Sequence, residues 1–577
     1  MTEAEGATVV LTGGTVRVDE TLVVDALGIR DGRVVAAGEL EEVLRACPDA
    51  EQVDVPGLVV APGLVDTHPR ALHFAAFAAP TVDVSDARDH ADIIGAIRRQ
   101  AARTPAREWV MTTPVGEPHY FIGRTWRDLT EGVLPDAVTL DAGTRDHPVV
   151  IQAWAPNLPN HAAFNTAALA VLGIGRDTPN HHGNVVVEKD DHGRPTGRLR
   201  GAVNNYYNLN HDDFWAAKWA QIPFVRPALI PGAAREALAT QNALGVTTIY
   251  EGHAMEPEHI AVYRTLAEEG ALTVRVLAAS EVLGAALQVG LADAATLGDQ
   301  LALAKAIEGD HGDFLRVDGF TIKPAGPFSN GKMVMREPYI GPFGERTTGE
   351  WHTSPSLLGT ALRQAASEGL RVNLCASGLG EHDVILGILD EMRAEGSIDG
   401  NERWILQHAY FLDERQATRY AEHGLQVTVS IGFTTGKGAR IRHRVGEQVM
   451  GHLNAFRRMI DSGLTVAGSS DWGPKNPFEC IALATTHRIG AGPSRNDGPA
   501  QVVSRREAYA MWGRQAAEVL GWREVGDLRP GSHADLVLLD RDPVTCALDD
   551  LPDTRVVATV VAGRTVTGAL PGSPRSG

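Results

Sequence analysis

The sequence predicts an α/β protein: a TIM (β/α)8 barrel joined to a composite β-sandwich domain that both ends of the chain build. Three observations support this prediction. The chain has 577 residues, which is long for one ordinary domain. Short strand-like runs occupy both of its ends, and apolar strand-like runs alternate with helical patterns between them. We therefore expect one large barrel with a smaller β domain beside it.

The two ends of the chain predict the β-sandwich. Residues 1–60 and 525–577 consist of short β-like runs, and Gly13–Gly14 and Asp31–Gly32 supply tight turns in the first of these segments. A single sandwich made from both ends is the preferred interpretation. Two independent β-caps remain the alternative.

The middle of the chain, residues 61–524, predicts the barrel. A long segment at 105–230, rich in Trp, Pro, Asn and His, exceeds the length of one strand-to-strand crossover, so we interpret it as an insertion over the barrel mouth. We place the eight strands so that they end at Asp66–His68 and within 245–253, 273–280, 319–323, 371–377, 404–408, 425–433 and 464–471.

Charge and composition narrow the range of partners. The formal net charge of −19 disfavours nucleic acid and anionic membrane surfaces, which leaves a small-molecule substrate. The first ten residues lack the pattern of a signal peptide, and no apolar stretch is long enough to span a membrane, so we expect a cytoplasmic protein. The scattered cysteines predict free thiols at Cys47, Cys375, Cys480 and Cys546.

Polar residues end several of the predicted strands, and active sites of such barrels lie at the carboxyl ends of the strands. One histidine there is more often structural than functional. Several imidazoles and carboxylates together require a cation, because they would otherwise repel one another or stay unsatisfied. The candidates for a metal site are His68, Glu251, His253, Lys323, Cys375, His408 and Asp471.

Several motifs in this order resemble the amidohydrolase superfamily, specifically its family 3 branch. They include VVAPGLVDTHP at the first strand, GFTIKPAG at the fourth, WILQHAYF at the sixth and VAGSSDWGP at the eighth. The resemblance covers almost the whole chain and implies a TIM barrel with a composite β-sandwich. It also implies metal-site positions for His68, Lys323, His408 and Asp471, a lysine that can be carbamylated to bridge two metals, and an aspartate that handles the proton of the attacking water.

The sequence departs from the family pattern at two ligand positions. Arg70 replaces the second histidine of the first-strand H-x-H motif, and a guanidinium does not ligate a cation. Cys375 replaces the fifth-strand histidine, although His73 or His382 could supply an imidazole from nearby. Glu251 and His253 are spaced so that an extended strand would point both the same way, which would add two ligands.

The altered ligand set favours iron, with zinc as the alternative, at a site for two divalent metal ions. The pattern resembles the TIM-barrel non-haem diiron monooxygenases of platensimycin and platencin biosynthesis. That resemblance implies dioxygen as co-substrate and hydroxylation of a bulky, diterpenoid-like acid carried as an acyl-CoA. The alternatives are a divalent-metal amidohydrolase that cleaves an amide C–N bond, with Asp471 as the proton shuttle, and an inactive barrel that acts as a binding protein.

Three further groups of residues are candidates for contacting the substrate. A basic segment after the seventh strand, interpreted as a loop, could bind a CoA phosphate, although a solvated face is the simpler explanation. Arg70 could orient an anion at the barrel mouth, and the insertion could contribute His161 and Asn165. The residues of the basic segment are Lys437, Arg440, Arg442 and Arg444. Barrels of this type often pair, so a homodimer is possible.

Overall fold

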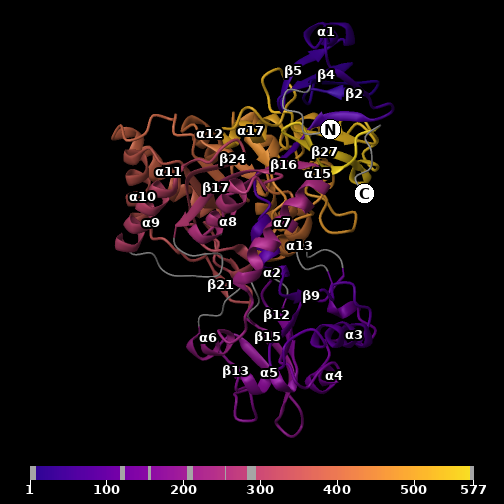
Figure 1. Cartoon of the computed structure of the whole chain (residues 1–577). Helices are drawn as coiled ribbons and strands as arrows, with labels where there is room; N and C mark the ends of the chain where they lie inside the picture. The colour runs from indigo at the N-terminus through magenta and orange to yellow at the C-terminus, as the bar shows by residue number, and fades with distance from the viewer. Residues whose placement is uncertain are drawn as a thin grey trace.

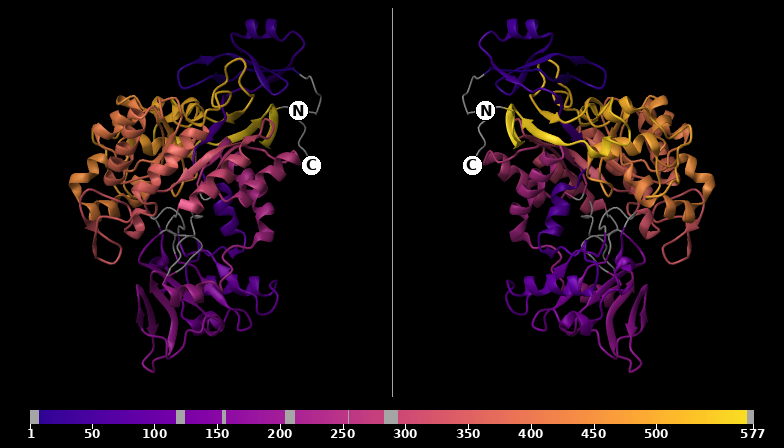
Figure 2. Two further views of the ribbon diagram at one scale, coloured as in Figure 1. Left: turned by 90° about the vertical axis from the view of Figure 1, so that its left-hand side faces the viewer. Right: turned by 90° about the vertical axis from the view of Figure 1, so that its right-hand side faces the viewer.

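The computed structural model of the chain describes residues 8–116, 124–153, 157–203, 212–253, 255–282 and 294–571. Figure 1 shows a central α/β barrel, with a β domain on one side of it and a separate lobe from the first half of the chain on the other. The two further views in Figure 2 show the same order, with the lobe and the β domain at opposite ends of the barrel.

Eight parallel strands form the barrel, which confirms the predicted fold class. Each predicted strand corresponds to an observed one, with most of the ends shifted by only a few residues. In chain order the strands are β8 (Leu64–Asp66), β16 (Val246–Glu251), β17 (Arg275–Val282), β19 (Leu315–Ile322), β22 (Val372–Ala376), β23 (Ile405–His408), β24 (Gln426–Val429) and β25 (Val466–Gly468).

Hydrogen bonds just beyond the first and last strands bring β8 and β25 together. The Thr67 hydroxyl donates to the Gly468 carbonyl at 2.9 Å, and the Asp471 amide donates to the His68 carbonyl at 3.0 Å. These bonds place His68 next to Asp471, although more than four hundred residues separate them along the chain.

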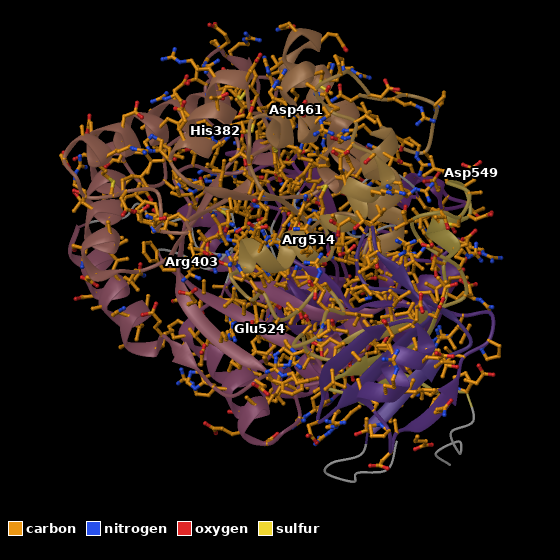
Figure 3. The ribbon with its side chains drawn as sticks, turned by 90° about the horizontal axis from the view of Figure 1, so that it is seen from above. His382, Arg403, Asp461, Arg514, Glu524 and Asp549 are labelled. Carbon is orange, nitrogen blue, oxygen red and sulfur yellow. The ribbon has the colours of Figure 1, made fainter. Side chains whose placement is uncertain are left out.

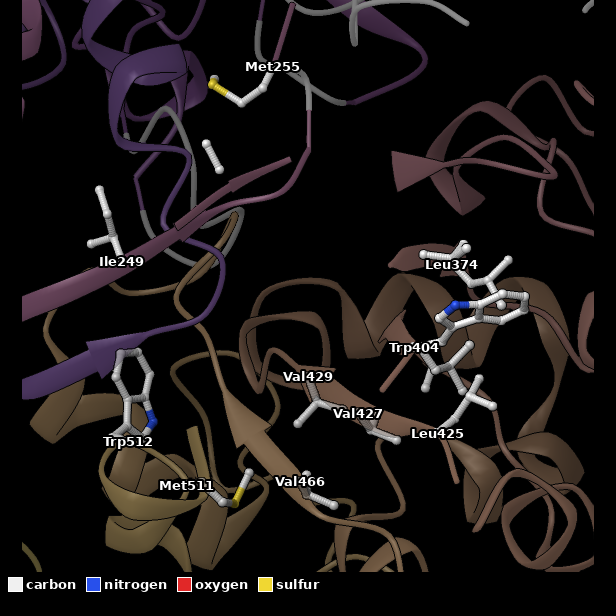
Figure 4. Close-up of a cluster of buried hydrophobic side chains, with 14 of the residues drawn as sticks. Ile249, Met255, Leu374, Trp404, Leu425, Val427, Val429, Val466, Met511 and Trp512 are labelled. Carbon is white, nitrogen blue, oxygen red and sulfur yellow. The ribbon is translucent and has the colours of Figure 1, made fainter. Parts of the chain in front are cut away.

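Helices surround the strands and bury an apolar layer between the two, as Figure 4 shows for Ile249, Val427, Val466 and Trp404. Burial of such side chains is worth roughly 1.5–3 kcal/mol each, so this layer is the main stabilising contact of the barrel. The helices after the successive strands are α2 (Ala71–Ala78), α7 (Ile230–Ala243), α8 (Pro257–Glu268), α9 (Ala294–Ile307), α10 (Pro355–Glu368), α11 (Leu379–Ala394), α12 (Glu414–Glu422), α13 (Gly432–Val445), α14 (Phe456–Asp461), α15 (Pro477–Thr486), α16 (Arg505–Ala510) and α17 (Arg514–Leu520).

The β domain contains two sheets. One has four strands, all from the start of the chain: β1 (Thr8–Thr12), β4 (Ala26–Arg30), β5 (Arg33–Gly38) and β6 (Glu51–Asp54), with α1 (Leu40–Ala46) packed on them. The other has six strands and combines both ends of the chain: β2 (Thr15–Arg17), β3 (Val23–Val24), β7 (Val59–Pro62), β26 (Leu536–Leu539), β27 (Val556–Val561) and β28 (Arg564–Gly568). The pairing of β7 with β26 joins the two ends directly.

A buried ion pair links the barrel to this β domain. Arg275 on β17 donates to Asp535 through Nε at 2.6 Å and Nη2 at 3.1 Å, and both side chains are at most 1% exposed. Breaking such a pair leaves one charge buried without compensation. We expect Arg275→Met to lower the free energy of unfolding by about 3–5 kcal/mol, measured by urea denaturation.

The matched control for this variant is Arg555→Met. Arg555 pairs with Asp540 at 3.0 Å, but its side chain is 79% exposed. An exposed pair contributes less than about 1 kcal/mol, so this variant should unfold almost as the wild type does. Equal effects of the two substitutions would show that the Arg275–Asp535 pair does not stabilise the domain junction.

The separate lobe contains a seven-stranded sheet. Its strands run from residue 81 to residue 201, so they begin before the segment 105–230 that the sequence suggested as an insertion. They are β9 (Thr81–Val82), β10 (Val110–Thr112), β11 (Val149–Ile151), β12 (Asn160–Phe164), β13 (His181–His182), β14 (Val185–Lys189) and β15 (Pro195–Gly201). The helices of the lobe are α3 (His90–Ala101), α4 (Ala137–Asp141), α5 (Thr166–Val171) and α6 (Asp213–Trp219).

The described part of the chain contains no helix long and apolar enough to cross a membrane. All four cysteines are free thiols, as the sequence predicts.

Candidate metal centre

One group of potential metal ligands joins the first, sixth and eighth barrel strands. His68 follows β8, His408 ends β23 and Asp471 follows β25, and one ligand atom from each lies within 4.8 Å of the other two. His68 Nε2 is 3.5 Å from Asp471 Oδ1, and His408 Nδ1 is 3.9 Å from Asp471 Oδ2. Three residues from distant parts of the sequence therefore face one point at the carboxyl ends of the strands.

A second group shares His408 with the first. It adds His253 and Cys375, again with one ligand atom of each within 4.8 Å of the others. The rings of His68 and His253 lie 5.6 Å apart, so the two groups are adjacent. Cys375, which stands where the family pattern has a histidine, therefore lies among the potential ligands. Burial raises the pKa of its thiol.

Glu281 lies beside His253, and it was not among the site residues predicted from the sequence. Its Oε1 lies 3.1 Å from Nδ1 of His253, and its side chain is fully buried. A carboxylate next to one ring nitrogen commonly fixes the orientation of an imidazole whose other nitrogen binds a metal. The signal was present in the sequence, because Glu281 directly follows the predicted strand 273–280.

The chemistry of these groups fits a divalent cation. Burial lowers the pKa of His68 well below its usual value, so the imidazole is neutral and can act as a ligand. Within the described residues, neither ring nitrogen of His68 has a hydrogen-bond partner, and neither does Oδ2 of Asp471. Buried polar atoms without partners are costly, and a cation bound by one ring nitrogen of His68 and by the Asp471 carboxylate would satisfy two of these atoms.

Arg70 lies beside this centre in place of a ligand. Its backbone is left-handed (φ 52°), its side chain is 2% exposed, and its Nε donates to Asp471 Oδ1 at 2.7 Å. Burial by itself would raise the pKa of Asp471, but Arg70, His68 and His408 together lower it far below its usual value. Asp471 is therefore a carboxylate, with one oxygen bound to Arg70 and the other directed to the ligand group.

Glu251 belongs to neither ligand group, and its role as a ligand stays a prediction, because its Oε2 has no hydrogen-bond partner among the described residues. Glu251 Oε1 accepts hydrogen bonds from the Leu72 amide at 3.0 Å and the Tyr263 hydroxyl at 2.8 Å, so the carboxylate anchors the start of α2. The prediction assumed that strand alternation continues to His253, whereas β16 ends at Glu251. His253 belongs to one of the two ligand groups, whereas Glu251 belongs to neither.

His382 and His73 were the candidates for replacing the missing imidazoles, and neither belongs to the two ligand groups. His382 lies on α11, among the outer helices seen from above in Figure 3, and its Nδ1 is 2.9 Å from the Tyr420 hydroxyl. The ring of His73 lies on α2, 4.4 Å from the ring of Phe77. Both histidines belong to the helical layer rather than to the ends of the strands.

A cavity at the barrel mouth gives access to the centre. Lys323, which follows β19, is half-buried in its wall, and Lys437 of α13 lines it as well. Burial lowers the pKa of Lys437 to about 7. The cavity is lined by both charged and aromatic side chains, including Arg70, His253, Cys375, His408, Tyr410, Asp471 and Trp472.

The two candidates from the lobe differ in their environment. Asn165 caps α5: its side-chain oxygen accepts from the amides of Ala168 and Val149, and its nitrogen donates to the carbonyls of Thr144 and His147. These contacts occupy the amide, so the prediction that Asn165 contacts substrate is not consistent with the structure. His161 instead packs on the Trp126 ring at 4.8 Å and lines a groove.

The basic segment at Lys437–Arg444 lies in a helix, α13 (Gly432–Val445), and the prediction of a loop was wrong. The glycines and threonines of this segment favour a loop when they are considered alone. In the structure Gly438 packs closely against Ile489, where a side chain would not fit without a shift, and this contact explains a glycine within the helix. Arg442 pairs with Glu447 at 2.9 Å and donates to the Ser494 hydroxyl at 3.0 Å, away from the groove that Arg440 and Arg444 line.

A barrel with buried imidazoles and an ionised carboxylate at the carboxyl ends of its strands defines a metal-dependent enzyme. The sequence model of the amidohydrolase family matches residues 51–567. The chain therefore belongs to the amidohydrolase family.

Several proteins to which the chain is similar carry names of hydrolytic enzymes. An N-substituted formamide deformylase of Arthrobacter pascens is 27% identical over 562 residues, covering 93% of this chain and 94% of that protein. An uncharacterised metal-dependent hydrolase of Pyrococcus horikoshii OT3 superposes with a TM-score of 0.70 at 20% identity, covering 94% of this chain and 99% of that one. A zinc complex of the atrazine chlorohydrolase TrzN of Arthrobacter aurescens TC1 superposes with a TM-score of 0.51 at 15% identity. The match covers 97% of this chain and 95% of that one.

These findings overturn the prediction of a diiron monooxygenase that hydroxylates a CoA-linked, diterpenoid-like acid. The family and the curated relative of A. pascens carry names of hydrolytic enzymes, which favours the amidohydrolase alternative over an oxygenase. The prediction depended on the barrel scaffold and on the pattern of lost and gained ligands, in which Arg70 and Cys375 replace histidines and Glu251 and His253 are added.

Proposed function

We propose that this chain is a divalent-metal-dependent hydrolase that cleaves the C–N bond of an N-substituted amide. The observation that carries the proposal is the convergence of neutral imidazoles and an ionised aspartate on one cavity at the barrel mouth. The similarity to the N-substituted formamide deformylase, which extends over 93% of this chain, supports the C–N bond as the target.

The residues that would hold the ion are His68, His408 and Asp471, with His253 and Cys375 beside them. Nitrogen, oxygen and sulfur ligands of this kind suit zinc. A divalent ion bound there supplies Lewis acidity, which polarises a carbonyl group and makes water more acidic.

Asp471 moves the proton in this proposal. Because Asp471 is ionised, its carboxylate accepts a proton from the attacking water as the new C–O bond forms. The same proton then passes to the nitrogen of the leaving group as the C–N bond breaks. The products are a carboxylic acid and an amine, so the reaction consumes one water and needs neither an oxidant nor a reductant.

The test is release of amine from a panel of N-formyl and N-acetyl amines by metal-loaded protein. We expect release that stops when a chelator removes the metal and returns when zinc is added, because the metal supplies the Lewis acid. A primary-amine reagent measures the product. Folded, metal-loaded protein that releases no amine from any member of the panel would contradict the proposal.

A further inference from the structure

A positively charged groove lies between the lobe and the barrel. Arg127 and His161 line it from the lobe, and Arg440 and Arg444 of α13 line it from the barrel. None of the described residues that line this groove is acidic, although the protein as a whole carries a formal charge of −19. So much positive charge in one groove of an acidic protein indicates a site for an anion.

Helix α13 connects this groove with the metal-centre cavity. Lys437, Arg440 and Arg444 are spaced three and four residues apart, so they share one face of the helix. Lys437 lines the cavity that contains Asp471, whereas Arg440 and Arg444 line the groove. With a rise of about 1.5 Å per residue, Arg440 begins about 4.5 Å and Arg444 about 10 Å further along the helix than Lys437.

The charges on this face influence one another. Burial and, to a smaller extent, the neighbouring Arg444 together lower the pKa of Arg440 to about 10. Arg440 in turn contributes to the low pKa of Lys437. Arg440 is therefore close enough to Arg444 and to Lys437 for their charges to repel, and a bound anion would relieve that repulsion.

Within the described residues, no carboxylate forms a hydrogen bond or ion pair with Arg440 or Arg444, and Glu345 acts on Arg444 only through its charge. Arg444 donates to the carbonyls of Leu158 at 3.0 Å and Ser329 at 3.3 Å, which fix its position without neutralising it. Arg440 makes no hydrogen bond or ion pair with any residue that the structure describes, and it faces the groove. Arg442 differs, because Glu447 neutralises it elsewhere on the helix.

We propose that the groove binds an oxyanion carried by the substrate, with Arg440 and Arg444 as its specificity-determining residues. The oxyanion, a carboxylate or a phosphate ester, would be joined by a short chain to the amide that lies at the metal centre. This inference relies on the proposed function only for the position of the C–N bond. Guanidinium groups bind such oxyanions through charge-assisted hydrogen bonds, which are stronger than neutral ones.

The experiment compares three probes by calorimetry on the metal-loaded full chain: N-acetyl-ε-aminocaproate, neutral N-acetylhexylamine, and the phosphate monoester of N-acetylaminohexanol. We expect the better of the two anions to bind at least about tenfold more tightly than the neutral probe. Arg440→Gln should remove that preference. Arg442→Gln, which makes the same change of charge on the same helix, should keep it.

Each outcome has a defined meaning. Tighter binding of the caproate than of the phosphate ester assigns the groove to carboxylates, and the reverse order assigns it to phosphate esters. Equal binding of all three probes, or equal loss in Arg440→Gln and Arg442→Gln, overturns the inference. Calorimetry measures the binding of a probe that is not cleaved, so a substrate panel that releases no amine would contradict the proposed function without touching this inference.

Discussion

Replacing Asp471 with Asn should lower kcat by about 10²- to 10⁴-fold, with a much smaller change in KM. The asparagine amide keeps the shape of the side chain and still accepts a hydrogen bond from Arg70, but it cannot take a proton from water. The buried carboxylate is ionised in the wild type because Arg70, His68 and His408 lower its pKa far below the usual range. The measurement is steady-state kinetics with an amide that the wild-type enzyme cleaves, together with the metal content of the variant.

Asp461→Asn is the matched control for this substitution. Asp461 ends α14, its side chain is 64% exposed, and it forms an ion pair with Arg457 at 2.8 Å. It belongs to neither of the two ligand groups. The control should retain wild-type kinetics, since exposed pairs contribute little even to stability. Wild-type kcat in a folded, metal-loaded Asp471→Asn variant would show that Asp471 does not carry the proton.

The His408→Ala variant should bind zinc more than about 100-fold more weakly than the wild type. His408 is shared by both ligand groups, so its removal damages both at once. Loss of a residue that only orients a ligand costs about 10- to 100-fold in affinity, and loss of the ligand itself should cost more. Competition with a chromogenic chelator measures the affinity.

His382→Ala separates a ligand effect from a general effect of removing a buried histidine. His382 is fully buried, whereas His408 is 12% exposed; His382 contacts Tyr420 and belongs to neither ligand group. Its loss should lower stability and leave zinc affinity unchanged. If the two variants lose zinc equally, His408 has no special role in binding the metal.

Much of the fold could be predicted because the signals are local and repeated. The runs that end at His408 and Asp471 are apolar and bounded by polar residues, which is typical of buried parallel strands. Their order in the chain then fixes their position around the barrel, and strand ends meet at one face. For this reason His68, His253, Cys375 and His408 could be brought together before the structure was known.

The sequence is least informative where tertiary contacts override local patterns. Glu251 ends a strand as His408 does, but Leu72 and Tyr263 come from other elements and turn its carboxylate toward α2. No spacing rule contains that information. The glycines of α13 likewise favour a loop when considered alone, and the close contact between Gly438 and Ile489 accounts for a glycine within the helix.

The measurement that tests the central claim most directly is the origin of the oxygen atom in the released acid. A substrate cleaved in water labelled with heavy oxygen, without dioxygen, should yield an acid that contains one labelled atom for each amine released, as mass spectrometry would show. Hydrolysis at the centre formed by His68, His408 and Asp471 predicts this result. Product that forms only with dioxygen, and whose new oxygen comes from it, would contradict the account.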